Sequence, residues 1–419
     1  MASERAKGTR DFLPEEDIVR EEIIGILKKT FENFGFSPIE TPIIEKYETL
    51  ASKYAGGSEI LKETFKLRDQ GNRELGLRYD LTVPLARIVA MNPQLKMPFK
   101  RYEIGEVFRD GPIKLGRYRQ FTQCDADVVG NKSMMADAEC IKLIQEAFDR
   151  LKINVTVEVN NRKILDSVLD YLKIEQEKRE QVITAIDKIK KVGVEEVKKE
   201  LKNAGIEDNK IRELMKIFSI KGSNKSKIAT IKKMVDGEGV AEIEQVFSNI
   251  NDKNVEFNVA LARGLSYYTG TVFEVFAKNK EVNVAIAGGG RYDKMIGYFL
   301  EGNREVPAVG ISFGLDPIID IVKGKQTRKT VTKAYIIPIN ATKKAIEVVD
   351  KLRKEGINTD IDLMERGISK NLEYANSLNI PYVIFIGKKE LKKKKIKLRD
   401  MKTGKEKLLT VKDAIKILK

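Results

Sequence analysis

Polar side chains alternate along one predicted strand in a way that suits a binding face. Residues 121–128 follow the period of two that is typical of β-structure, so one face carries Phe121, Gln123, Asp125 and Asp127. The residues between them form a second face suited to packing: Thr122, Cys124, Ala126 and Val128. Solvent exposure is the ordinary explanation of a polar strand face, and a binding site is the alternative.

Three arginines flank this strand and favour binding. Arg109, Arg117 and Arg119 lie on or beside the loop that precedes it, and the forked N–H donors of a guanidinium group suit phosphate. With these three arginines beside it, the polar strand face is as well explained by a binding site as by solvent exposure. The sequence contains no histidine, so chemistry that needs an imidazole base or a histidine-bound metal is excluded.

The composition indicates a globular protein of several domains. A chain of 419 residues exceeds one ordinary core and predicts about two to four domains. The net charge of +15 points to a polyanion such as nucleic acid, with a lysine-rich proteome as the alternative. No apolar run approaches the ~20 residues of a membrane span, and the first residues lack a signal-peptide core. We therefore expect a cytoplasmic protein without a membrane partner.

Several elements are expected to position the polar face. Residues 99–109 alternate like 121–128, and turn residues lie between them, which predicts a long antiparallel hairpin. The two cysteines, Cys124 in a strand and Cys140 in a helix, lack metal-ligand spacing, so we expect neither a disulfide nor a metal site. The other expected elements here are a helix at 15–34, a proline-punctuated edge strand or domain contact at 36–45, a short strand at 78–81 and a helix from Thr82.

The rest of the chain alternates between helical and strand-rich segments. Residues 160–254 are lysine-rich and helical, which predicts an inserted helical domain. Strands are expected at 255–276, at 282–287 leading into three glycines, and at 308–313, followed by a helix with Asp316 as N-cap and Pro317 as first residue.

A small α/β domain is expected after the charged linker at 323–333. Its predicted strands are 334–339, 359–363 and 382–386, its helices 342–355, 371–378 and 411–418, with a hairpin around Lys402. Lys388, Lys389 and the run 392–395 suit a solvated turn or a surface that faces RNA equally well.

Five separated motifs resemble those of the histidyl-tRNA synthetases, a branch of the class II aminoacyl-tRNA synthetases. FGFSPIETPIIE resembles class II motif 1, and FKRYEIGEVFRDG with GRYRQFTQCDAD resembles motif 2. LARGLSYYTGTVFE, residues 261–274, and AGGGRYD resemble the two blocks particular to the histidine-specific branch, and NLEYANSLNIPYVIFIG resembles its anticodon-binding domain.

The resemblance implies an α+β class II architecture. It implies a catalytic domain with a mixed, mostly antiparallel sheet in two parts, residues 1–159 and 255–322, separated by the helical insertion at 160–254. The linker at 323–333 leads to an anticodon-binding domain at 334–419. It also implies a homodimer formed through motif 1.

The resemblance implies that the protein activates L-histidine with ATP and transfers it to tRNA(His). Neither step needs a side-chain base, since the nucleophile of the first step, the histidine carboxylate, is already an anion. Arg109 and Arg263 are then the catalytic clamps on the α-phosphate and substrate carboxylate, Phe121 stacks on adenine, and Arg117 is the candidate for the γ-phosphate. Mg²⁺ accompanies ATP, and no metal site of the protein itself is expected.

The same resemblance implies a set of histidine-binding residues. Asp80, Thr82 and Gln123 form the site for the α-amino end, while Asp127, Tyr267 and Tyr268 surround the ring, and Leu81 belongs to the same histidine-binding set. A carboxylate acceptor and a phenolic donor match the N–H and the bare nitrogen of a neutral imidazole. Arg109 and Arg263 complete the set at the carboxylate.

Two positions depart from the family pattern. Thr122 stands where many relatives carry histidine or an aromatic residue, but its strand parity points it away from the site. Pro317 stands where class II motif 3 has an arginine that holds ATP, so that contact is either lost or supplied elsewhere, with Arg291 and Arg304 as the candidates. The departure keeps open an alternative function, a non-catalytic regulatory subunit of ATP phosphoribosyltransferase that senses histidine.

Overall fold

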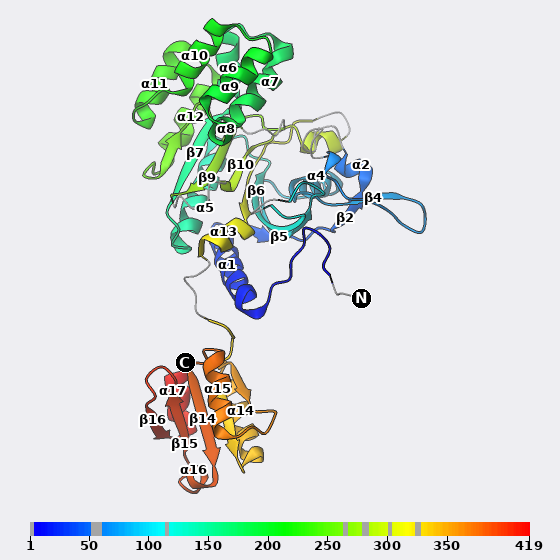
Figure 1. Cartoon of the computed structure of the whole chain (residues 1–419). Helices are drawn as coiled ribbons and strands as arrows, with labels where there is room; N and C mark the ends of the chain where they lie inside the picture. The colour runs from blue at the N-terminus through cyan, green and yellow to red at the C-terminus, as the bar shows by residue number, and fades with distance from the viewer. Residues whose placement is uncertain are drawn as a thin grey trace. The chain divides into compact units, whose positions relative to one another are not determined.

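A computed structural model of the chain describes residues 4–51, 61–113, 117–262, 267–278, 285–300, 304–322 and 328–419. The chain divides into two compact units, one of Met1–Arg10 with Ile23–Ile321 and one of Asp11–Glu22 with Val322–Lys419. Each contains a large β-sheet with helices packed on it (Figure 1). Among the described residues, no helix is both long and apolar enough to cross a membrane.

The first unit is organised around a mixed, mostly antiparallel sheet of eight strands. Only the β1–β5 and β7–β8 pairs are parallel, and the predicted hairpin is confirmed as the antiparallel pair β5–β6. In sheet order the strands are β1 (Ser37–Pro38), β5 (Phe99–Phe108), β6 (Gln120–Val129), β11 (Ala308–Gly314), β10 (Ala285–Arg291), β9 (Thr271–Ala277), β7 (Val155–Asn161) and β8 (Val255–Phe257). Strand β1 lies at the edge, as its proline predicts.

The two faces of this sheet are covered differently. On one face lie the second half of α1 (Pro14–Asn33) and α5 (Met134–Arg150), whose Phe31 and Phe148 rings lie 5.7 and 5.6 Å from the Phe313 ring. On the other, α4 (Thr82–Met91) and η1 (Ile296–Phe299) pack around Tyr79 and Tyr292 at one end. The remainder of that second face is free to form a cavity.

Smaller elements complete the first unit. A three-stranded sheet is formed by β2 (Ile44–Lys46), β4 (Glu74–Leu77) and β3 (Lys66–Arg68), next to the short helix α2 (Tyr47–Leu50). The predicted helical segment connects the neighbouring strands β7 and β8. It consists of α6 (Arg162–Tyr171), α7 (Gln176–Asp187), α8 (Ile189–Val192), α9 (Val194–Asn203), α10 (Asp208–Phe218), α11 (Asn224–Met234) and α12 (Glu238–Ser248).

Three local expectations in this unit are wrong. The strand expected at 78–81 is not formed: β4 ends at Leu77, and residues 78–81 connect it to α4, where the Asp80 side chain accepts from the first backbone N–H groups of the helix. The glycines 288–290 do not follow a strand but lie inside β10, where a Cβ at Gly289 would stand 2.0 Å from the Gly310 carbonyl oxygen. A close strand contact, not a turn, therefore explains that glycine. Helix α13 (Leu315–Val322) begins before Asp316, so Asp316 is not its N-cap. Its carboxylate instead forms an ion pair with Arg10.

The second unit confirms the predicted α/β pattern. Its five strands run in the order β13 (Thr359–Ile361), β12 (Ala334–Ile339), β14 (Tyr382–Gly387), β15 (Ile396–Asp400) and β16 (Glu406–Leu409). Helices α14 (Thr342–Lys354) and α17 (Val411–Leu418) pack on one face, and α15 (Ile368–Ser377) packs on the other. The short helix α16 (Lys388–Lys392) leads into the lysine run.

Candidate active site

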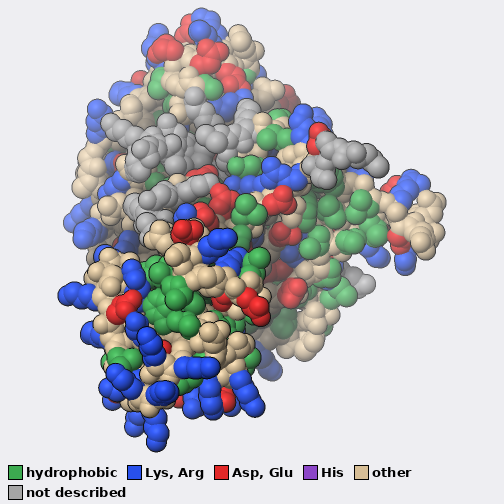
Figure 2. Space-filling model, turned by 60° about the horizontal axis from the view of Figure 1, so that its bottom comes forward, with side chains coloured by type: hydrophobic (Ala, Val, Ile, Leu, Met, Phe, Trp, Pro, Cys, Tyr) green, Lys and Arg blue, Asp and Glu red, His purple; other side chains and the backbone are tan. Residues whose placement is uncertain are grey.

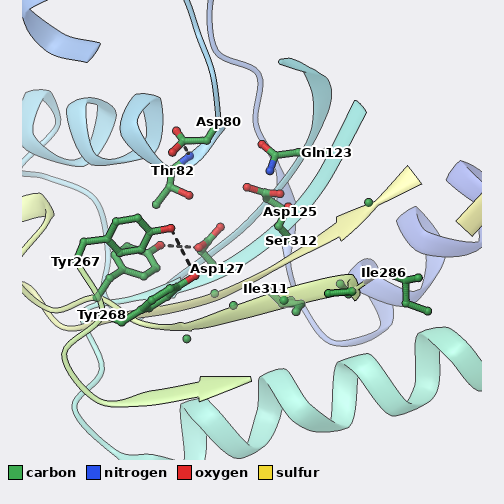
Figure 3. A pocket seen from close by; sticks show the side chains of 18 of the residues that line it. Asp80, Thr82, Gln123, Asp125, Asp127, Tyr267, Tyr268, Ile286, Ile311 and Ser312 are labelled. Carbon is green, nitrogen blue, oxygen red and sulfur yellow. Dashed lines mark hydrogen bonds between the residues drawn. The ribbon is translucent and has the colours of Figure 1, made fainter. Parts of the chain in front are cut away.

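A cavity of about 240 Å³ lies on the second face of the eight-stranded sheet. Its walls come from β6, the first turn of α4, the segment before β9 and the strands β10 and β11 (Figure 3). It brings together eight of the residues expected in the site: Asp80, Thr82, Arg109, Phe121, Gln123, Asp127, Tyr267 and Tyr268. Leu81 and Arg117 do not line it, and Arg263 lies outside the described residues.

The floor of the cavity is made of small residues because of the strand register. Gln123, Asp125 and Asp127 of β6 pair with Gly314, Ser312 and Gly310 of β11, and Gly288 and Gly290 of β10 continue the same rows. A Cβ at Gly310 would lie 1.8 Å from Asp127 Oδ1. Larger side chains in these rows would therefore fill the space above the sheet.

Asp127 is held by two buried partners under the cavity. Arg101 Nη2 lies 2.7 Å from Asp127 Oδ2, and the Tyr292 hydroxyl donates to Asp127 Oδ1 at 2.5 Å. Burial raises the pKa of Asp127, and the Arg101 guanidinium opposes that shift. The carboxylate is thereby fixed in one orientation at the wall of the cavity.

Asp80 occupies the N-terminal end of helix α4. Its Oδ1 accepts hydrogen bonds from the backbone N–H groups of Thr82 (3.1 Å) and Val83 (3.0 Å). Burial raises the pKa of Asp80, and the hydrogen bond from the Val83 N–H opposes the rise. Leu81 is fully buried, and its carbonyl accepts from Arg101 Nη2 at 3.1 Å. Leu81 thus supports the site through its backbone.

Arg109 supplies the positive charge of the described cavity wall. Its Nε donates to the Tyr79 carbonyl at 3.1 Å, and its guanidinium carbon lies 5.1 Å from the centroid of the Phe121 ring. Burial lowers the pKa of this guanidinium, which still remains charged. Arg117 instead points to solvent and forms an ion pair with Glu63 at 2.8 Å. To reach a phosphate, Arg117 has to exchange that carboxylate for it.

Two tyrosines, whose ring planes are tilted by 51° to each other, close the side of the cavity opposite Gln123 (Figure 3). The Tyr267 and Tyr268 rings lie 4.5 Å apart, with the Tyr267 hydroxyl 3.4 Å from that of Tyr268. The Tyr292 ring meets Tyr267 edge-on at 6.2 Å. This arrangement gives the cavity phenolic groups near the Asp127 carboxylate, which suits a small heteroaromatic ring.

Several cavity residues were not assigned a role from the sequence. Asp125 was placed on the polar face but given no function, and Ser312 was not singled out. Arg101 and Tyr292 were likewise missed as partners of Asp127. The alternation of residues 99–108 along a strand places Arg101 on the same face as Glu103. This pattern was the one sequence signal for a buried role of Arg101. Its pairing with Asp127 depends on the register that the intervening loop sets.

The two arginines expected to replace the motif 3 arginine do not lie in the cavity. Arg291 is buried in ion pairs with Asp137 and, at 3.2 Å, with Asp293. Arg304 is exposed and does not line the cavity either. The arginine that reaches the vicinity of Pro317 is Arg10, which pairs with Asp316 and lies 4.4 Å from the Tyr118 ring centroid. Thr122 points away from the cavity as expected.

Comparison with known proteins gives the family of the chain. The family model described as histidyl-tRNA synthetase matches residues 8–318, which include every described wall of the cavity. The chain belongs to the histidyl-tRNA synthetase family. A second model, described as an anticodon binding domain, matches residues 333–419. The first match ends at residue 318 and the second begins at residue 333.

Individual members of the histidyl-tRNA synthetase family match over nearly their full length. The chain is 43% identical to a Bacillus cereus protein named histidine–tRNA ligase 1, over 97% of each chain. A histidyl-tRNA synthetase structure from Nostoc sp. PCC 7120 superposes with a TM-score of 0.89 at 28% identity, covering 100% of this chain and 99% of that one. A structure from Bacillus halodurans titled ATP phosphoribosyltransferase regulatory subunit/histidyl-tRNA synthetase shares the fold, with a TM-score of 0.78 at 22% identity over 92% of this chain and 99% of that one.

Proposed function

We propose that the chain is a histidine–tRNA ligase. It activates L-histidine with ATP to histidyl-adenylate and pyrophosphate, then transfers the histidyl group to the 3′ end of tRNA(His). The observation that carries this proposal is the cavity itself, in which Asp80, Gln123, Asp127 and the Tyr267–Tyr268 pair face the same space as the buried guanidinium of Arg109. One small site thus combines side chains that suit an amino acid with a cation that suits a phosphate.

In the first step, a carboxylate oxygen of histidine forms a bond to the α-phosphorus of ATP. The bond from that phosphorus to the bridging oxygen breaks, and pyrophosphate leaves with the electron pair. Negative charge on the phosphoryl oxygens grows in the transition state, where a fixed cation stabilises it more than in the ground state. Arg109 is placed to do this at one wall, and Arg263 is proposed as the second clamp from its motif.

In the second step, a hydroxyl of the terminal tRNA ribose attacks the carbonyl carbon of the adenylate. The carbon–oxygen bond to AMP breaks, AMP leaves with the electron pair, and the hydroxyl proton passes to a phosphate oxygen of the departing AMP. The match of residues 333–419 to an anticodon binding domain supports tRNA as the acceptor. Figure 2 shows Lys and Arg side chains scattered over the visible surface, in keeping with the net charge of +15 and a polyanionic partner.

The residue roles follow from position and chemistry. The α-ammonium group of histidine is bound by Asp80, Thr82 and Gln123 beside the Leu81 backbone. Its imidazole lies between Asp127 and the Tyr267–Tyr268 pair, since a carboxylate and a phenol match the two ring nitrogens. ATP stacks its adenine on Phe121 and places phosphates on Arg109 and Arg117.

Three further features complete the proposal. Mg²⁺ enters with ATP, bound by the phosphate oxygens that this hard cation prefers. Two copies associate through the motif 1 segment, where Ile43 and Ile44 are 38% and 52% exposed and exposed apolar side chains favour a contact. The enzyme works in the cytoplasm, where tRNA is charged.

The alternative is a histidine-sensing regulatory subunit without catalysis. The domain match at 333–419 favours the synthetase, because a sensor has no use for an anticodon-binding domain. The experiment is to incubate the protein with ATP, total tRNA and each labelled amino acid in turn. We expect histidine alone to be transferred to tRNA. Histidine binding without any ATP-dependent product would instead identify a sensor.

A further inference from the structure

We propose that Asp125, between Gln123 and Asp127 on the cavity face of β6, is a further specificity-determining residue that accepts a hydrogen bond from the α-ammonium group of histidine. This inference rests on the proposed function, since it takes histidine as the ligand. It adds a residue to which neither the motifs nor the family resemblance gave a role. Four observations on the molecule support it.

The first observation is an unused acceptor. Asp125 is 3% exposed and lines the cavity, and its Oδ1 has no hydrogen-bond partner among the described residues. A buried carboxylate oxygen without a hydrogen-bond partner costs free energy, because it has lost its hydrogen bonds to water. Oδ2 of Asp127 also lacks a hydrogen bond, but it lies 2.7 Å from Arg101 Nη2 in an ion pair, and Asp127 Oδ1 accepts from the Tyr292 hydroxyl. Asp125 forms no ion pair among the described residues, so its Oδ1 is the acceptor in this row that has neither a hydrogen bond nor a paired cation.

The second observation is the neighbouring acceptor on Gln123. Its Oε1 is also buried without a hydrogen-bond partner among the residues described, and Figure 3 shows Gln123 and Asp125 side by side, across the cavity from Asp80 and Thr82. An ammonium group has three N–H donors and no acceptor. Asp80, Gln123 and Asp125 offer one carbonyl and two carboxylates around one space, which matches those donors.

The third observation is the charge balance. Three carboxylates line the cavity, those of Asp80, Asp125 and Asp127, while Glu103 behind them is taken by Arg78 at 2.9 Å. Two described guanidinium groups face the three, Arg101 and Arg109. When all three carboxyl groups are ionised, the described part of the site has one negative charge in excess, and a ligand cation compensates it.

The fourth observation is the effect of this environment on the proton affinity of Asp125. Burial raises the pKa of Asp125 to about 8, Arg101 opposes the rise, and Asp127 and Asp80 add to it, while the Ser312 hydroxyl beside it lowers the value. Near neutral pH the empty site therefore holds a proton on this carboxyl. An arriving ammonium group favours the carboxylate, so histidine binding displaces that proton.

The experiment compares histidine with its des-amino analogue, imidazole-4-propionate, which lacks only the ammonium group. Binding of both is measured by calorimetry at pH 8, which requires no turnover, on wild-type protein, Asp125→Asn and Asp125→Ala. Cys124→Ala is the matched control, because its side chain is buried on the opposite face of the same strand. Thermal melting establishes that each variant is folded, and the near-isosteric Asp125→Asn serves if Asp125→Ala does not fold.

We expect Asp125→Asn to weaken histidine binding about 10- to 100-fold, the loss typical of a hydrogen bond between charged groups, and to leave the analogue within about twofold. ATP should bind equally well to the variant and wild type. Equal weakening of histidine and the analogue, or no weakening of histidine, would overturn the inference. A wild-type protein that binds histidine but forms no adenylate would contradict the proposed function and leave the role of Asp125 standing.

Discussion

Arg101 and Asp127 face each other across the paired strands β5 and β6, with 2.7 Å between Nη2 and Oδ2. Both side chains are at most 4% exposed, so neither charge is stabilised by water. The pair lies directly under the proposed imidazole site. Its removal should therefore affect folding and substrate binding together.

Arg101→Met is expected to lower the free energy of unfolding by about 3–5 kcal/mol, because it leaves the Asp127 carboxylate buried without its cation. Urea denaturation followed by circular dichroism measures the change. The control is Lys344→Met, which removes a half-exposed partner of Glu347 and should cost less than about 1 kcal/mol. Equal stabilities of the two variants would show that the buried pair contributes no more to stability than the surface pair.

The affinity for histidine should rise with pH. Burial raises the pKa of Asp125 to about 8, so its carboxyl is mostly protonated in the empty site at pH 7 and must lose that proton to accept an ammonium group. Between pH 7 and 8 the ionised fraction grows about fivefold, and the dissociation constant of histidine should fall by a similar factor, then level off. Calorimetry on wild type and Asp125→Asn checks this. A wild-type dissociation constant as flat with pH as that of the variant would contradict it.

Tyr267→Phe is expected to raise the KM for histidine about tenfold and to leave the KM for ATP unchanged. The substitution removes the hydroxyl that faces the proposed ring site and leaves the aromatic ring in place, 4.5 Å from that of Tyr268. One lost hydrogen bond is worth about 1 kcal/mol or more. Tyr171→Phe is the control, since Tyr171 is 53% exposed on α6. Equal changes in both KM values would mean that Tyr267 has a structural role and makes no specific contact with histidine.

The lysines at the end of α16 should contribute to tRNA binding. Lys392, Lys393 and Lys394 are exposed and form no ion pair among the described residues. Replacing all three with alanine should weaken tRNA binding and flatten its dependence on salt, because fewer phosphates are neutralised. Filter binding at several salt concentrations measures both.

A matched triple variant tests whether position matters beyond charge. Lys343, Lys351 and Lys354 on α14 are also exposed and lie in the same domain. Their replacement removes the same charge from another surface. Equal effects of the two triple variants would mean that the lysine run is an ordinary solvated turn.

The sequence predicted the elements of the fold better than their junctions. Period-two alternation identified β5 and β6, and helix and strand patterns identified the elements of the second unit, because local periodicity reflects burial directly. The N-cap role predicted for Asp316 at the start of α13 is wrong, because its carboxylate binds Arg10, a residue 306 positions away. Such long-range pairing leaves no local pattern.

In the candidate site, too, the sequence predicted local patterns and missed long-range contacts. Parity placed Gln123, Asp125 and Asp127 on one face, and the cavity is lined by all three. Arg101, which comes from another strand, forms an ion pair with Asp127 and none with Asp125 among the described residues. Because register joins these residues, only the structure shows which of the two carboxylates is paired with a cation.

The central claim is that this cavity activates histidine with ATP. The most direct measurement is the exchange of labelled pyrophosphate into ATP with each amino acid, on wild type and on Arg109→Ala. Exchange that depends on histidine alone, and that falls at least 100-fold in the variant because the buried guanidinium beside Phe121 is lost, is the predicted result. No exchange with histidine, or equal exchange without Arg109, would contradict the account.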